Sequence, residues 1–135
     1  MNVAIRYYSK SGHTETLANA ISEEMDVPAK PISEGLDEDV DVLFLGSSIY
    51  GNSIDPAVVE FFNNLDVNIG CIVSFSTAGI MESTYDQIKE LTDLFDIKLS
   101  LDEFHCPGEF AGINAGRPNK DDVEDVKAFV KGLFD

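Results

Sequence analysis

The chain has 135 residues, 44% of them hydrophobic, which fits one domain (residues 1–135) with a packed core. Its net charge of −16, from 9 basic and 25 acidic residues, disfavours binding to nucleic acid and to anionic membranes, since both contacts depend on Lys and Arg. No apolar run approaches the roughly 20 residues that span a bilayer, and no signal-peptide pattern opens the chain. A cytoplasmic protein is therefore expected.

The first predicted elements are a strand over Val3–Tyr8 and a helix whose apolar spacing begins at about Thr14. The sequence Ser9-Lys10-Ser11-Gly12-His13-Thr14 joins them. The first N–H groups of a helix lack intrahelical partners and carry partial positive charge, so a turn rich in hydroxyl groups and glycine at this junction suits a phosphate group. Simple helix capping is the alternative interpretation.

Further strands follow at regular intervals. Residues 27–32 form a short extended piece, and its prolines confine it to a sheet edge. Val42–Leu45 and Ile69–Phe75 are apolar runs typical of buried parallel strands. Between them, Asp55 and Pro56 predict a helix N-cap and a first helical residue.

The second half of the chain continues the alternation. Ser83 with Asp86 three residues later resembles a capping box that opens a third helix. Residues 97–101 alternate between apolar and polar side chains, which predicts a half-exposed edge strand. Asn119 and Asp122 open a final helix. The element order predicts a doubly wound α/β domain with a parallel sheet and helices on both faces.

In such a fold, ligands bind at the carboxyl ends of the strands. Three segments rich in Ser, Thr and Gly follow strands here, at residues 9–14, 46–53 and 76–81. None contains the G-x-x-x-x-G-K-[ST] or G-x-G-x-x-G pattern, which disfavours ATP and NAD binding through those motifs. A ligand with a phosphate at one end and a flat ring system at the other suits these segments.

The cysteines point to no separate site. Cys71 lies in an apolar strand and is expected to be a buried thiol. Cys106 follows His105, but neighbours on a strand face opposite sides, so a nucleophile–base pair is disfavoured. The spacing of these residues also disfavours a structural zinc site.

Over nearly its whole length the chain resembles the flavodoxin family. The motifs that carry the resemblance are S-x-S-G-x-T at residues 9–14, G-S-S-I-Y-G-N at 46–52 and F-S-T-A-G at 75–79. The C-terminal sequences F-H-C-P-G-E-F at 104–110 and G-R-P-N at 116–119 are similar to the ends of short flavodoxin-like proteins. The resemblance implies a five-stranded parallel sheet in the order 2-1-3-4-5.

The resemblance also implies that the chain binds flavin mononucleotide (FMN) non-covalently. It assigns the phosphate to Ser9, Lys10, Ser11, Gly12, His13 and Thr14, and the rest of the cofactor to Ser47, Ser48, Ile49, Tyr50, Gly51, Asn52, Ser76, Thr77, Ala78, Gly79 and Ile80. Tyr50 would lie against the isoalloxazine ring, and the Gly51–Asn52 peptide matches one that reorients in some flavodoxins when the flavin is reduced. No metal ligand and no catalytic residue is assigned.

The function implied is that of a low-potential one-electron carrier, a monomer that docks on basic surfaces of reductases and other oxidoreductases. The chain departs from many flavodoxins because it has no Trp, and Ala78, Gly79 and Ile80 stand where the family often places a stacking aromatic residue. An open flavin face keeps a second function possible, a small FMN-dependent reductase acting on NAD(P)H or a quinone. A flavin-free binding module is a third possibility. A response-regulator-like phosphoacceptor is disfavoured, because Tyr7-Tyr8-Ser9 replaces the acidic residues it needs.

Overall fold

The computed structural model describes residues 1–50, 53–78, 83–109 and 114–134. Its parallel strands are β1 (Val3–Tyr7), β2 (Ala29–Pro31), β3 (Val40–Tyr50), β5 (Ile69–Ala78) and β6 (Phe104–Pro107). They lie side by side in the order β2-β1-β3-β5-β6, and the two-residue β4 (Ser53–Ile54) pairs antiparallel with the end of β3. Without β4, this is the predicted order 2-1-3-4-5 in a five-stranded parallel sheet.

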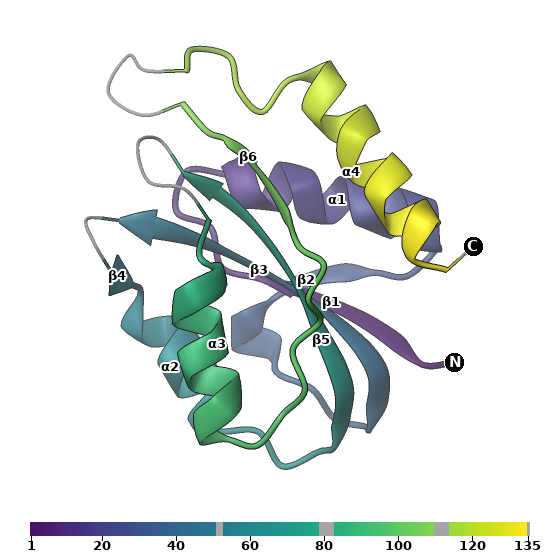
Figure 1. Ribbon diagram of the computed structural model, residues 1–135, viewed down its shortest axis with the longest axis vertical. Helices are drawn as coiled ribbons and strands as arrows, with labels where there is room; N and C mark the ends of the chain where they lie inside the picture. The colour runs from purple at the N-terminus through teal and green to yellow at the C-terminus, as the bar shows by residue number, and fades with distance from the viewer. Residues whose placement is uncertain (51–52, 79–82, 110–113, 135) are drawn as a thin grey trace.

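Helices cover both faces of the sheet, as predicted. The helices are α1 (His13–Met25), α2 (Pro56–Asn63), α3 (Tyr85–Leu94) and α4 (Lys120–Leu133), with a single 3-10 turn, η1 (Ile32–Glu34), after β2. Figure 1 shows α1 and α4 on one face and α2 and α3 on the other. In the part of the chain that the structure describes, none of these helices combines the length and apolar character needed to cross a membrane.

Two of the predicted helix caps are confirmed, and for the third helix the predicted place of the start holds but the predicted capping box does not. The Asp55 carboxylate accepts the N–H of Ala57 at 2.9 Å, directly before Pro56 in the first position of α2. Asn119 and Asp122 form a reciprocal capping box at α4. The capping box expected from Ser83 and Asp86 is absent, because Thr84 is the N-cap of α3 and its side chain makes no capping bond.

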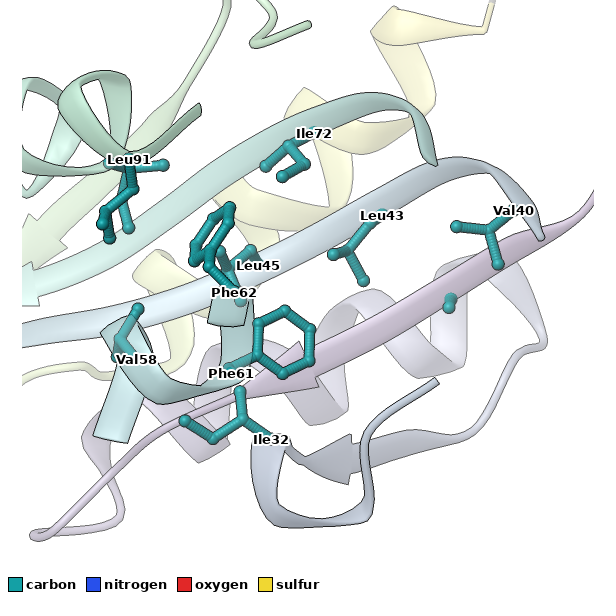
Figure 2. Packing of buried hydrophobic residues seen from close by; sticks show 11 residues of the cluster. Ile32, Val40, Leu43, Leu45, Val58, Phe61, Phe62, Ile72 and Leu91 are labelled. Atoms are coloured by element: carbon teal, nitrogen blue, oxygen red, sulfur yellow. The ribbon is translucent and has the colours of Figure 1, made fainter. Parts of the chain in front are cut away.

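The core consists of two layers separated by the sheet. Alternate residues of the central strands point to opposite faces: Leu43 and Leu45 pack under α2 and α3, and Phe44 packs under α1 and α4. Figure 2 shows the first of these layers, with Val58 and Phe62 of α2 over the strands. Because helices bury both faces of the sheet, both sets of alternate residues are apolar, and the central strands are continuous apolar runs in the sequence.

The last strand lies later in the chain than predicted. Within residues 97–101, Leu99 makes one isolated bridge to Ile72, and Leu101 is 93% exposed. The edge strand is instead β6, where Phe104 pairs with Phe75. Packing decides this register, because the Phe104 ring lies 5.8 Å from the Phe129 ring of α4 and Cys106 is buried in the same layer.

Candidate functional site

Those predicted site residues that the structure describes lie at the carboxyl edge of the sheet, and several of them belong to strands rather than loops. β3 continues through Tyr50 and β5 through Ala78, so Gly46–Tyr50 and Ser76–Ala78 are strand residues. Ser47 pairs with Ser76, and Ser48 with Thr77. Of these four side chains, those of Ser48 and Thr77 face α1, and those of Ser47 and Ser76 face the start of α3. The predicted site residues Gly51, Asn52, Gly79 and Ile80 lie outside the described residues.

A close approach between helix and sheet explains Gly46. A Cβ atom on this residue would overlap the Phe75 ring and would lie 2.8 Å from Cγ2 of Thr14 in α1. Glycine therefore lets the first turn of α1 come down onto β3 and β5. This approach places the N-terminus of α1 directly over the ends of the two central strands.

Three buried hydroxyl groups join α1 to these strands. The Oγ1 atoms of Thr14 and Thr77 are 3.0 Å apart, Thr77 Oγ1 lies 3.2 Å from Ser48 Oγ, and Ser48 Oγ also bonds to Thr14 Oγ1. We call Thr14, Ser48 and Thr77 the hydroxyl cluster. Because each group is buried and bonded to the others, the cluster fixes the height and rotation of the helix N-terminus.

A second pair of contacts fixes the start of α3. Ser47 Oγ and Thr84 Oγ1 are 2.8 Å apart, and Ser76 Oγ accepts the N–H of Thr84 at 3.4 Å. Ser47, Ser76 and Thr84 are all fully buried. Sequence reasoning did not single out Thr84, although a Thr at the start of a predicted helix was a visible signal.

The turn between β1 and α1 (residues 8–12, the β1–α1 turn) is built to leave N–H groups of the helix without side-chain caps. Ser9 Oγ accepts the N–H of Gly12 at 2.9 Å, which closes the turn. Gly12 is the N-cap of α1 at φ 88°, and it supplies no side-chain cap. By contrast, Asp55 and Asn119 cap α2 and α4 with side-chain oxygens. The start of α1 therefore offers N–H groups and the positive end of the helix dipole to an anion.

Lys10 of this turn is paired with a residue that the sequence had marked only as a helix cap. Its Nζ lies 3.3 Å from Oδ2 of Asp55. The pKa of Asp55 lies below its ordinary value, chiefly because the Ala57 N–H donates to it, with further hydrogen bonds from Lys10 and the Tyr8 hydroxyl opposing the effect of burial. The pair ties the β1–α1 turn to the start of α2.

The chain after β6 closes the other side of the turn. Nε2 of His13 lies 3.0 Å from the carbonyl oxygen of Glu109. A Cβ on Gly108 would lie 3.3 Å from Thr77 Cβ and 3.4 Å from His13 Cδ2, so this segment runs close to the hydroxyl cluster. Gly108 and Glu109 were not among the predicted site residues, because only the fold brings residues so far apart in sequence together.

The cysteines lie apart from any nucleophile–base arrangement. Cys106 is buried and His105 is exposed, as the alternation predicts, and burial raises the pKa of the Cys106 thiol to about 12. Cys71 is half-buried, so the expectation of a buried thiol there is wrong: it lies near the start of β5, on the α1 and α4 face with Val73 and Phe75, and belongs to neither core layer. The described residues contain no cluster of His, Cys, Asp and Glu fit for a metal ion.

The known proteins similar to this chain fall into two groups. No family model matches the chain. An uncharacterized protein from Methanocaldococcus jannaschii is 29% identical over 137 aligned positions, which cover 90% of each chain.

Solved structures give the second group. Oxidised flavodoxin 2 from Bacillus cereus matches 99% of this chain and 98% of its own length, with a TM-score of 0.72 and 19% identity. A flavodoxin from the domain Archaea has a TM-score of 0.71 and 14% identity over 98% of this chain and 96% of its own. Rubredoxin oxygen:oxidoreductase from Desulfovibrio gigas matches 96% of this chain with 34% of its length, at a TM-score of 0.70 and 17% identity. Together with the strand order, these likenesses show that the chain has the flavodoxin-like fold.

Proposed function

We propose that this chain binds FMN and carries single electrons between redox proteins. One observation carries the proposal most: the start of α1, without a side-chain cap, lies over the carboxyl ends of β1, β3 and β5. A phosphate at a helix N-terminus gains both N–H donors and the helix dipole. Several structural neighbours are flavodoxins, and this supports the same class of ligand.

The residues present fit the phosphate of such a cofactor. Gly12 has positive φ, and a Cβ built on it would meet nothing within 4 Å, so the turn has open space beside it. Ser11 is exposed next to that space, and Ser9 already holds the turn closed. The exposed Glu15 in the first turn of α1 works against an anion, but the Tyr7 hydroxyl donates to it at 3.1 Å and draws it towards β1.

Each part of the site has a distinct task in this proposal. The bound FMN would supply the one-electron chemistry. The β1–α1 turn would bind its phosphate, the hydroxyl cluster would hold that turn rigid, and the ends of β3 and β5 would carry the segments that flank the ring system. The predicted contacts of Tyr50, Gly51 and Asn52 with the ring stay part of the proposal.

The proposal extends to location and partners. The protein acts in the cytoplasm as a monomer, and its net charge of −16 suits transient docking on basic surfaces of reductases and oxidoreductases. A flavodoxin-like fold also forms about a third of the D. gigas oxidoreductase, where it is one part of a larger chain. A carrier depends on a separate reductase, whereas the alternative, a small FMN-dependent reductase, is itself reduced by NAD(P)H or reduces a quinone directly.

Paired titrations of the apo-protein with FMN and riboflavin test the phosphate role. Replacing the exposed Ser11 with Glu puts a carboxylate beside the phosphate, and we expect FMN to bind at least tenfold more weakly, about 1.4 kcal/mol. Riboflavin lacks the phosphate and should bind as before. Ser11→Gln is the matched control of similar size.

Two results would count against the proposal. One is equal weakening of FMN and riboflavin in Ser11→Glu, which would remove the phosphate from the β1–α1 turn. The other is recovery of FAD, or of no flavin, after acid release from the purified protein.

A further inference from the structure

The connection from β2 to β3 leaves a hollow on the α2 face of the sheet. Parallel strands are usually joined by about a dozen residues or more that form an α-helix. Here residues 32–39 make the crossing with only the η1 turn. A pocket of about 570 Å³, the side pocket, lies between this connection, the end of β1 and the helix α2. Pockets of this size, roughly 300–1,000 Å³, are typical of small-molecule sites.

The floor of the side pocket is apolar. Ile32 of η1 and Phe61 of α2 are 8% and 5% exposed, and both line the pocket. Figure 2 shows these two side chains next to each other at the margin of the core layer. Leu36, Leu65 and the Tyr8 ring pack against the same layer and complete the lining. Such a floor favours a ligand with an apolar or aromatic body.

The rim of the side pocket is acidic. Glu34, Asp37 and Glu60, the rim carboxylates, all line it and are exposed. Among the described lining residues there is no Lys or Arg. A ligand that reaches this rim therefore meets carboxylates of both the β2–β3 connection and α2.

The Arg6 guanidinium on this face is held by backbone groups. Arg6 of β1 is 9% exposed; its Nε donates to the carbonyl oxygen of Gly35 at 2.7 Å and its Nη1 to that of Ile5 at 2.9 Å. The guanidinium thus fastens the β2–β3 connection to β1 below the rim. Burial lowers its pKa, while Glu34 and Asp37 oppose that effect. The connection that carries Glu34 and Asp37 is therefore tied to the sheet.

We propose that the side pocket binds a small organic cation, a molecule with an apolar body and one ammonium or guanidinium group. The body would lie on Ile32, Phe61 and Leu36, and the cationic group would meet the rim carboxylates. A bare metal ion does not suit an apolar floor, and a pocket of this volume is large enough for a whole small molecule.

The side pocket borders the candidate phosphate site but lies on the other face of the sheet. Tyr8 and Ser9, the first two residues of the β1–α1 turn, line the pocket, while Ser9 Oγ accepts the N–H of Gly12 within the turn. The Tyr8 side chain packs in the layer under α2 and α3, whereas α1 lies on the other face of the sheet. The proposal therefore stands whether or not the chain binds FMN.

Three probes with one aromatic body test the proposal: phenethylamine, 2-phenylethanol and 3-phenylpropionate. We follow the backbone amides of the ¹⁵N-labelled protein by NMR at low salt. Phenethylamine should shift amides of residues 32–37 and 57–65, the alcohol should bind more weakly, and the carboxylate should not bind there. Glu60→Gln and Asp37→Asn should each weaken the amine about two- to fivefold, as expected for exposed ion pairs.

Two further variants serve as controls. Glu90→Gln changes an exposed carboxylate on α3, outside the pocket lining, and should leave the affinity for phenethylamine unchanged. Ser33→Trp places a large side chain at the pocket from an exposed position of η1 and should abolish the binding of phenethylamine. The amide resonances of the sheet should keep their positions, which shows that the variant is folded.

Three outcomes would overturn the proposal. Equal binding of amine and alcohol would remove the role of charge. If phenethylamine shifts amides near acidic residues all over the protein, it binds as a non-specific counter-ion and not in the side pocket. If a heptalysine peptide shifts the amides of residues 32–37 and 57–65 and phenethylamine does not, this face binds basic proteins and not a small cation.

Discussion

At the scale of single residues, Asp55 joins two elements through two carboxylate oxygens. Oδ1 caps α2 at Ala57, and Oδ2 pairs with Lys10. Asp55→Asn keeps an oxygen for the cap and removes the charge that neutralises Lys10. We expect FMN to bind about two- to fivefold more tightly, as for loss of one partly exposed ion pair, and riboflavin to bind as before. Fluorescence titrations of the apo-protein measure both, and a parallel gain for the two ligands would contradict the phosphate-directed effect.

Asp122 makes the stability of the C-terminal segment depend on pH. Arg117 donates to its two oxygens, each at 2.6 Å, and the N–H of Asn119 donates at 2.8 Å, while the Asp122 side chain is 4% exposed. These bonds, Arg117 first, hold the pKa of Asp122 below its ordinary value. A lowered carboxyl pKa stabilises the fold above the unfolded value of about 3.9, and this stability is lost as pH falls through the folded pKa.

Asp122→Asn should therefore lower the free energy of unfolding by about 2–3 kcal/mol at pH 7, as for hydrogen bonds to a charged group. The difference from the unmodified protein should shrink as pH falls below about 4. Urea unfolding at a series of pH values measures this. Glu124→Gln, an exposed change on the same helix, is the control, and a loss that stays constant down to low pH would show that charge is not its cause.

At the scale of elements, the fit between α1 and the sheet depends on glycine in β3. Gly46→Ala would place a Cβ against the Phe75 ring and Thr14, and we expect it to cost about 1–3 kcal/mol through overpacking. Gly132→Ala is the matched control, because Gly132 lies within α4 and its Cβ would meet nothing within 4 Å. That change should be neutral or stabilise the protein by up to about 1 kcal/mol. Urea unfolding of both variants decides, and equal effects would refute the close approach.

At the scale of the whole molecule, the charge of −16 should govern encounter rates. Long-range attraction is screened once the Debye length falls to about 10 Å, near 0.1 M salt. Electron transfer from the reduced protein to a basic c-type cytochrome should slow as ionic strength rises. Transfer to ferricyanide, an anion, should become faster, because the same field repels it. Stopped-flow rates for both acceptors test this. Identical salt dependence for the two would show that the net charge does not govern the encounter rate.

Local chemistry determined much of this fold. Apolar runs identified β3 and β5 because strands buried on both faces have little room for polar side chains. Asp55 with Pro56, and Asn119 with Asp122, marked two helix starts because caps act within a few residues. The β1–α1 turn was predictable for the same reason: glycine and hydroxyl side chains at a strand–helix junction act on their own neighbours.

Tertiary packing decided the remainder. The last strand is β6 and not residues 97–101, because Phe104 and Cys106 fit the layer under α4. In the earlier stretch, Ile97 and Leu99 are only partly buried, and Leu99 makes an isolated bridge to Ile72. The Ser and Thr residues expected in loops are buried strand ends, because α1 covers Ser48 and Thr77 on one face and the start of α3 covers Ser47 and Ser76 on the other. The Lys10–Asp55 pair, the contact of His13 with Glu109 and the side pocket join residues far apart in the chain. The sequence alone therefore determined the order of elements and the end of the sheet where the candidate site lies, whereas only the folded chain decided which side chains meet there, because those contacts depend on distances across the sheet.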